Sequence, residues 1–157
     1  MDEFDLKILD IVQRDNRLPT EKIAERVGLS PSAVQRRLKR LRKDGIIEAD
    51  VAIISPEMVG RRLTAIVEVT LQTEGHISPA AERFKRLMLD APEVMQCYHV
   101  TGDADIILVV TVRDIQEYEA FTRRYFVENA SVRRYKTSIV INRVKAKTLI
   151  PLSTEEL

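Results

Sequence analysis

The chain has 157 residues, 45% hydrophobic and 31% charged, a balance typical of globular rather than disordered proteins. The formal net charge is +1, so affinity for nucleic acid would require local clustering of cations. The single cysteine, Cys97, excludes an internal disulfide. The acidic N-terminus does not suit a signal peptide, and the longest apolar run (Ile106 to Val110) is too short for a membrane span, so a cytoplasmic protein is expected.

Three short helices are predicted at the N-terminus, where apolar residues recur at helical spacing among charged ones. The first covers Phe4 to Arg14, and the second covers Glu21 to Val27 with Thr20 as its expected N-cap. The third runs from about Pro31 to Lys43, because Ser30 is a favourable N-cap and proline suits the first helical position.

The second and third helices are joined by a short turn that contains Gly28. Glycine allows the sharp change of direction that a helix-turn-helix needs. The third helix is strongly basic, and no acidic residue occurs between Arg26 and Asp44. A basic helix face by itself usually means only a solvated surface. Its position after a glycine turn and two short helices instead favours binding to double-stranded DNA.

Side chains of the third helix divide into two expected roles. Residues near the start of such a helix reach base edges, and glutamine and arginine suit adenine and guanine. Cations further along are placed for phosphates, as is a serine at the helix N-terminus. The expected base-reading residues are Ser32, Gln35 and Arg36, and the expected phosphate-binding residues are Ser30, Lys39, Arg40 and Lys43.

The rest of the chain alternates between strand and helix patterns. An extended connector at 46–54 and a short turn at 57–62 precede them. The order βαββαβ is the ferredoxin-like arrangement, so the fold class is α+β. The expected strands are 63–73, 94–101, 105–112 and 132–142, the expected helices are 79–89 and 115–127, and 145–152 is an extended tail. The nearly all-apolar strand 105–112 is expected to be central in the sheet.

Catalytic and metal-binding functions find little support. Ferredoxin-like domains also host enzymes, but the nearby acids Asp103, Asp105, Glu117 and Glu119 have no histidine partner. His76, His99 and Cys97 lack the spacing of zinc ligands. No phosphate loop or dinucleotide fingerprint occurs. We therefore expect a protein that is not an enzyme and has no metal or cofactor.

Several stretches together resemble the Lrp/AsnC family, the feast/famine transcription regulators of bacteria and archaea. They are 5–9, 23–30, 37–41, 44–47 and 101–105, and the resemblance covers nearly the whole chain. It implies a winged helix-turn-helix domain with its linker at 1–54, a connector at 55–62, and an αβ-sandwich domain at 63–157 for effector binding and oligomerisation.

The resemblance also implies an effector and self-assembly. Family members form dimers through the sheets of the second domain, and the dimers assemble into tetramers or octamers. An amino acid or related metabolite binds between dimers, near a turn that corresponds here to Thr101, Gly102, Asp103, Ala104 and Asp105, with Thr137 and Ser138 nearby.

The chemistry of this turn is compatible with an amino acid. Backbone N–H groups in a glycine turn can hold a carboxylate, and Asp105 can hold an ammonium group. The same Gly-Asp sequence also suits a plain hairpin turn. An alternative therefore stays open, namely an architectural or co-regulatory DNA-binding protein without a ligand.

Overall fold

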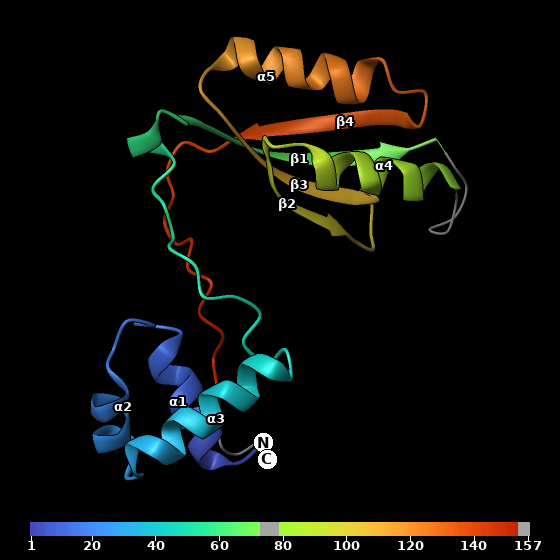
Figure 1. Cartoon of the computed structure of the whole chain (residues 1–157). Helices are drawn as coiled ribbons and strands as arrows, with labels where there is room; N and C mark the ends of the chain where they lie inside the picture. The colour runs from blue at the N-terminus through green and yellow to red at the C-terminus, as the bar shows by residue number, and fades with distance from the viewer. Residues whose placement is uncertain (73–78, 154–157) are drawn as a thin grey trace. The chain divides into compact units, whose positions relative to one another are not determined.

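The computed structural model describes residues 1–72 and 79–153, and these form two compact units (Figure 1). The first unit is Met1–Ile53 together with the residues from Lys145, and the second is Ile54–Val144. The C-terminal tail, which is predicted to belong to the second domain, thus groups with the first unit. Two predicted features, the end of the first strand at Thr73 and His76, lie outside the described residues. No helix in the described part of the chain is long and apolar enough to span a membrane.

The first unit is a three-helix fold built on the predicted helices. They are α1 (Glu3–Val12), α2 (Thr20–Val27) and α3 (Pro31–Lys43). Their apolar faces meet in one core, because each helix buries residues at helical spacing. The fully buried centre of this core includes Ile8 of α1 and Val34 and Leu41 of α3. These contacts fix the direction in which the opposite face of α3 points.

The ends of these helices confirm one predicted cap and correct another. Ser30 is the N-cap of α3, and its Oγ accepts a hydrogen bond from the Ala33 N–H at 3.2 Å. Thr20 is not a cap but the first residue of α2. Pro19 takes the cap position because its extended backbone leaves its carbonyl free to accept from the N–H groups of Lys22 and Ile23, at 3.0 and 3.1 Å.

The second unit is the expected ferredoxin-like βαββαβ domain. Its sheet has the order β2-β3-β1-β4 with every neighbouring pair antiparallel, so β3 is central as predicted. Both helices cover the same face of the sheet (Figure 1). The elements are a short 3₁₀ helix (Glu57–Val59), β1 (Leu63–Leu71), α4 (Pro79–Asp90), β2 (Val94–His99), β3 (Ile106–Val112), α5 (Ile115–Thr122) with a π-helical turn (Arg123–Val127), and β4 (Val132–Ile139).

Alternation along the two central strands places the core of this unit. Every second residue of β3, from Ile106 to Val112, is fully buried, and Ala65, Val67 and Val69 of β1 match them. They pack against apolar and aromatic side chains of the two helices, including Phe84 of α4. The other face of the sheet carries the intervening residues and is not covered by either helix.

One predicted strand is shorter in the structure. The last strand ends at Ile139 rather than Asn142, because pairing with β1 runs out at the start of that strand. Residues 46–54 form neither a helix nor a strand, as expected for the predicted connector. A wing strand is therefore not formed by the described part of this chain alone.

Candidate nucleic-acid interface and ligand turn

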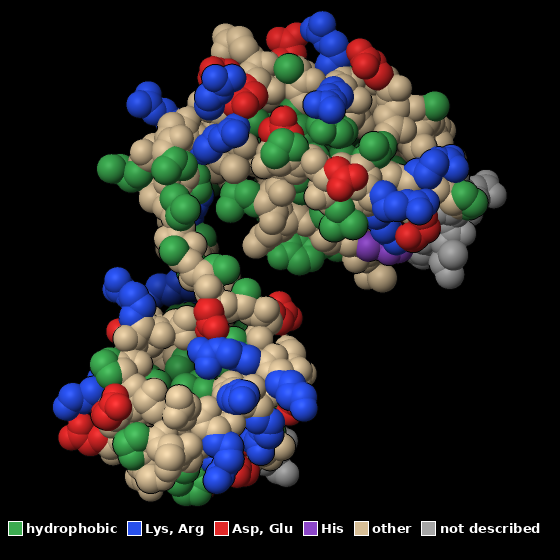
Figure 2. Space-filling view, in the orientation of Figure 1, with side chains coloured by type: hydrophobic (Ala, Val, Ile, Leu, Met, Phe, Trp, Pro, Cys, Tyr) green, Lys and Arg blue, Asp and Glu red, His purple; other side chains and the backbone are tan. Residues whose placement is uncertain are grey.

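One face of α3 presents cations to solvent. Val34, Leu38 and Leu41 turn into the core, so the side chains on the opposite face point outward. Figure 2 shows Lys and Arg side chains gathered over this region. The exposed residues of this face are Ser32, Gln35, Arg36, Lys39 and Lys43. Within residues 1–72 and 79–153, Arg36, Lys39 and Lys43 make neither an ion pair nor a hydrogen bond, so their charges are uncompensated.

The start of α3 also presents hydroxyl groups. Ser30 and Ser32 share a hydrogen bond between their Oγ atoms at 3.1 Å, and both residues are exposed. Because the Ser30 hydroxyl already caps the helix, Ser32 is the better placed of the two to meet another molecule. The structure therefore brings the predicted base-reading residues Ser32, Gln35 and Arg36 to the exposed N-terminal part of α3.

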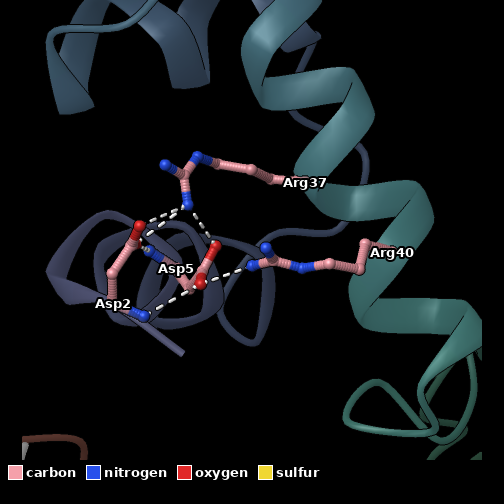
Figure 3. A network of polar contacts seen from close by, with 4 residues as sticks. All are labelled: Asp2, Asp5, Arg37 and Arg40. Carbon is pink, nitrogen blue, oxygen red and sulfur yellow. Dashed lines mark hydrogen bonds and ion pairs between the residues drawn. The ribbon is translucent and has the colours of Figure 1, made fainter.

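Other cations of α3 are held by carboxylates of α1. Arg37 Nη1 donates to both carboxylate oxygens of Asp2, at 2.8 and 2.9 Å, and to Asp5 Oδ1 at 2.7 Å. Arg40 Nη2 donates to Asp5 Oδ2 at 2.5 Å. Figure 3 shows both guanidinium groups reaching from α3 to the start of α1. Arg40, which is predicted to bind a phosphate, thus also forms an ion pair within the protein.

The two carboxylates of this network, Asp2 and Asp5, are held in place by hydrogen bonds to each other's backbone. Asp2 and Asp5 form a capping box, because each side chain accepts a hydrogen bond from the other residue's N–H. The Asp5 side chain is only 1% exposed. Burial by itself raises the pKa of Asp5, but the Asp2 N–H and Arg37 outweigh it and hold that pKa below 3.8. Asp5 is therefore a buried carboxylate that stays ionised near neutral pH.

The signal for this network was present in the sequence but was missed. An Asp-x-x-Asp pattern directly before an apolar helical stretch is a variant of the capping-box signature. It predicts two carboxylates at the first turn of α1. Their pairing with Arg37 and Arg40, more than thirty residues away, depends on how α1 packs against α3. A second missed pair joins Arg42 Nε to Asp50 Oδ2 at 2.7 Å.

A groove runs beside the exposed face of α3. Its volume is about 390 Å³, and it lies within the first unit. Polar residues from α3, from the turn before α2 and from the first position of α2 line it together with apolar core residues. The lining residues from α3 are Gln35, Leu38, Lys39 and Arg42, and the polar residues Asn16 and Thr20 also line the groove. Gln35 and Lys39 therefore lie at a concave part of the surface of the first unit.

The predicted ligand turn lies at the start of β3. Thr101, Gly102 and Asp103 are exposed, and Gly102 has φ +121°, in the region that favours glycine. Among the described residues, the N–H groups of Gly102 and Asp103 have no hydrogen-bond partner. We call residues 101–105 the 101–105 turn. Its exposed first half therefore presents two backbone N–H donors to its surroundings.

The second half of the same turn is tied to β1. Ala104 is buried, and Asp105 is half-buried. Asp105 Oδ2 accepts the Leu71 N–H at 2.8 Å, and the Asp105 N–H donates to the Val69 carbonyl at 3.0 Å. Asp105 thus anchors the turn to the sheet, which differs from its predicted role as a holder of ammonium.

The two other predicted ligand residues lie apart from the turn within one chain. Thr137 lies opposite Val67 on β1, and Ser138 lies opposite Ile66, so their side chains point to opposite faces of the sheet. Thr137 shares a 2.6 Å hydrogen bond with Tyr118 Oη on the helix-covered face. Register therefore separates Thr137 and Ser138 from each other and from the start of β3.

The uncovered face of the sheet is partly apolar. Strand register places Ile66, Ile107, Val109 and Tyr98 on this face, and Ile66 and Tyr98 are 41% and 50% exposed. The Glu68 and Lys136 side chains flank the apolar residues as an ion pair with an N–O distance of 3.7 Å. We call these residues the open sheet face. An apolar sheet surface of this kind is typical of a protein contact.

Comparison with known families matches both units. Residues 1–48 match the winged helix-turn-helix DNA-binding family, and residues 64–150 match the Lrp/AsnC ligand binding domain. An uncharacterized HTH-type transcriptional regulator of Sinorhizobium fredii is 51% identical, over 97% of this chain and 89% of the relative. The Bkd operon transcriptional regulator of Pseudomonas aeruginosa is 33% identical, over 97% of this chain and 98% of the relative.

Solved structures agree with these matches. A transcriptional regulator of Neisseria meningitidis, determined as a complex with L-methionine, superposes with a TM-score of 0.89 and 32% identity, and 96% of each chain is covered. An AsnC family regulator of Agrobacterium tumefaciens has a TM-score of 0.87 and 33% identity, covering 96% of this chain and 97% of its own.

Proposed function

The chain belongs to the Lrp/AsnC family of DNA-binding transcription regulators, and from that premise we propose which of its surfaces bind DNA, an effector and a second copy. The helix α3 enters the major groove of a target site. The 101–105 turn holds an amino acid or a related metabolite. The open sheet face joins two copies. Because its DNA target lies in the cytoplasm of a bacterial or archaeal cell, the protein acts there.

The uncompensated cations of α3 carry the DNA part of this proposal. Arg36, Lys39 and Lys43 are exposed and lack partners among the described residues, so binding to DNA would not require them to break existing ion pairs. Ser32, Gln35 and Arg36 lie in the first half of the helix, where side chains reach base edges. Lys39, Arg40 and Lys43 lie further along and meet phosphates, as does Ser30 at the helix start.

A binding experiment tests these roles. A target duplex is first selected from a random pool, and its affinity is measured at several salt concentrations beside that of a scrambled duplex. Arg36→Ala should weaken binding to the selected duplex by about 1–3 kcal/mol and affect the scrambled duplex less. Lys39→Ala should weaken both equally and reduce the salt slope by about 1. Equal effects of the two changes would refute the division, and salt-insensitive binding would refute the interface.

The exposed half of the 101–105 turn carries the effector part. The N–H groups of Gly102 and Asp103 can hold a carboxylate, as adjacent backbone donors do in anion-binding turns. The exposed Asp103 carboxylate replaces Asp105 as the group for an ammonium, since Asp105 bonds to Leu71. Thr101 completes the exposed edge, while Ala104 and Asp105 support it. Within one chain, Thr137 and Ser138 lie apart from this turn, so we do not include them in the proposed site.

A thermal-shift screen of the twenty amino acids, with L-methionine first because one relative was solved with it, tests this site. A ligand that binds the folded protein at 100 times its Kd adds about 2.7 kcal/mol of stability. Any hit should lose its effect in the Asp103→Asn variant. If no amino acid changes the melting temperature or the oligomeric state, the alternative of a DNA-binding architectural protein without a ligand is favoured.

The open sheet face carries the part of the proposal that concerns assembly. An apolar centre flanked by an ion pair is complementary to a second copy of itself related by two-fold symmetry. A dimer presents two α3 helices, which suits half-sites about one DNA turn apart. Dimers then join into a tetramer or octamer, and an amino acid bound between them changes how many α3 helices engage DNA together.

A further inference from the structure

Arg40 lies at the border between the free and the paired cations of α3. With about 100° of rotation per residue, Arg40 is about 40° from Arg36 on one side and about 60° from Arg37 on the other. Arg37 faces α1 and its side chain is 20% exposed, whereas the Arg40 side chain is 50% exposed. Arg40 is thus the paired arginine of this network that also reaches the exposed face.

Only part of the Arg40 guanidinium is used inside the protein. A guanidinium has five N–H donors in a rigid plane, and the described structure gives Arg40 one bond, from Nη2 to Asp5 Oδ2 at 2.5 Å. Half of the side chain remains in solvent. The planar group can therefore bond to Asp5 along one edge while another edge meets a phosphate oxygen.

Asp5 is suited to hold that group in place. Its side chain is buried, Oδ1 accepts from Arg37, and Oδ2 accepts from the Asp2 N–H at 3.0 Å as well as from Arg40. The capping box and Arg37 therefore hold the Asp5 carboxylate in place independently of Arg40 (Figure 3). A fixed acceptor limits the rotamers of a long side chain and so lowers the entropy that it loses on binding.

We propose that Asp5 is a positioning residue for DNA binding, because it holds the Arg40 guanidinium with its free edge toward a backbone phosphate. Arg37 serves the same end by keeping Asp5 ionised and in place, without contacting DNA itself. The inference rests on the proposed function of α3 as the DNA-binding helix. It adds a residue of α1, buried and negatively charged, to the residues that determine affinity for a polyanion.

The direction in which DNA affinity changes when the Asp5 charge is removed separates this proposal from a general electrostatic effect. Removal of a negative charge near DNA should tighten binding, because the protein becomes more positive. If Asp5 positions Arg40, the isosteric change Asp5→Asn should instead weaken binding to selected and scrambled duplexes alike, by roughly fivefold to tenfold, and lower the salt slope by about one phosphate contact.

A matched control is available on the same helix. Asp10 also pairs with an arginine, since Arg14 Nη2 lies 2.9 Å from Asp10 Oδ1, but Arg14 follows the end of α1 and is not a residue of α3. Asp10→Asn makes the same change of charge and frees an arginine. It should bind DNA as tightly as the wild type or slightly more tightly, with an unchanged salt slope. A loss in Asp10→Asn equal to that in Asp5→Asn would overturn the proposal.

A double-variant cycle tests whether Asp5 affects DNA binding through Arg40. Arg40→Ala alone should weaken binding and lower the salt slope as Asp5→Asn does. In the double variant, Asp5→Asn should add no further loss, because the group that it positions is gone. Additive losses, or an unchanged or tighter affinity of Asp5→Asn, would overturn the proposal while leaving the DNA-binding role of α3 intact. Absence of salt-sensitive binding by the wild type would instead defeat the proposed function itself.

A second variant keeps the test usable if Asp5→Asn does not fold. Arg40→Lys keeps the charge and leaves Asp5 in place, but an ammonium group lacks the planar fork that can bridge two anions. If Arg40 acts only as a charge, Arg40→Lys binds like the wild type, which would overturn the proposal. If Arg40 bridges Asp5 and a phosphate, Arg40→Lys loses most of what Arg40→Ala loses.

Discussion

The carboxylate of Asp5 links the folding of the first unit to pH. Its pKa in the folded protein is below the ordinary 3.8, so its ion pairs stabilise the unit fully above that pH. The contribution is lost as the pH falls below about 3.8 toward the lower pKa of the folded state. Asp2 titrates in the same direction, because the Asp5 N–H and then Arg37 lower its pKa.

The corresponding prediction concerns Asp5→Asn. At neutral pH this change should lower the free energy of unfolding by about 1.5–3 kcal/mol, the usual range for a lost hydrogen bond to a charged group. In urea titrations between pH 2.5 and 7, the gap between wild type and variant should narrow below pH 3.8. A gap that stays constant over this range would mean that Asp5 does not contribute through its ionised form.

Gly102 is the residue on which the shape of the 101–105 turn depends. An added Cβ would meet nothing within 4 Å, so the cost of a side chain arises from φ +121° rather than from a clash. Gly102→Val should destabilise the second unit by about 1–3 kcal/mol and reduce any stabilisation by an amino acid. Gly45→Ala is the control, because it introduces a Cβ at φ +73° in the first unit, again with open space around it. An amino-acid response that survives Gly102→Val would remove the turn from the site.

At the scale of elements, the side chain of Gln13 joins the helical part of the first unit to the C-terminal tail. Gln13 Nε2 donates to the Ile150 carbonyl at 3.0 Å, and the Ile150 N–H donates to Gln13 Oε1 at 2.9 Å. An amide side chain here pairs with backbone as a neighbouring strand would. Ile150 is 67% exposed, so water can replace these bonds at small cost.

We therefore expect Gln13→Ala to change the dynamics of the tail more than the stability of the unit. The free energy of unfolding should fall by less than about 1 kcal/mol. Hydrogen exchange of the Ile150 amide should become much faster, because its acceptor is lost. Asp10→Asn weakens the neighbouring hydrogen bond from Gln13 Nε2, because an uncharged amide oxygen replaces the carboxylate, but keeps the bonds to Ile150, so it should leave that exchange rate unchanged. Equal exchange rates in Gln13→Ala and the wild type would contradict the pairing.

At the scale of the whole molecule, the chain passes between its two units twice, at Ile53–Ile54 and at Val144–Lys145. The ligand-binding unit is therefore inserted within the DNA-binding unit, and the tail provides a second covalent connection. An effector that changes the assembly of one unit can then restrict the other through both connections. We propose that the open sheet face decides whether two copies form.

Ile66→Glu tests that face directly. A charge at the centre of the open sheet face would be buried in a dimer, so the variant should be monomeric by light scattering at concentrations where the wild type is a dimer. Its affinity for a two-half-site duplex should fall by at least tenfold, because two α3 helices no longer act together. Leu89→Glu, at an 80% exposed position on α4, is the control and should stay dimeric. A dimeric Ile66→Glu would move the interface elsewhere.

Local patterns in the sequence were sufficient to predict most of the fold and part of the site. The Ser30-Pro31 cap, the helical spacing of Val34, Leu38 and Leu41, and the apolar run of β3 each depend on a few neighbouring residues. Such signals persist because capping, helix periodicity and strand alternation are short-range effects. The sequence by itself thus determined the three helices, the βαββαβ order and the exposed basic face of α3.

Only the tertiary structure decided which of those cations are free. Six lysines and arginines of α3 look equivalent in sequence, yet Arg37 and Arg40 pair with Asp5 and Arg42 pairs with Asp50. The same holds for Asp105, which the Leu71 N–H occupies, and for Thr137 and Ser138, which strand register separates. These outcomes depend on the packing of α1 against α3 and on the pairing of strands distant in sequence. Periodicity along one segment carries no information about which distant group lies opposite it.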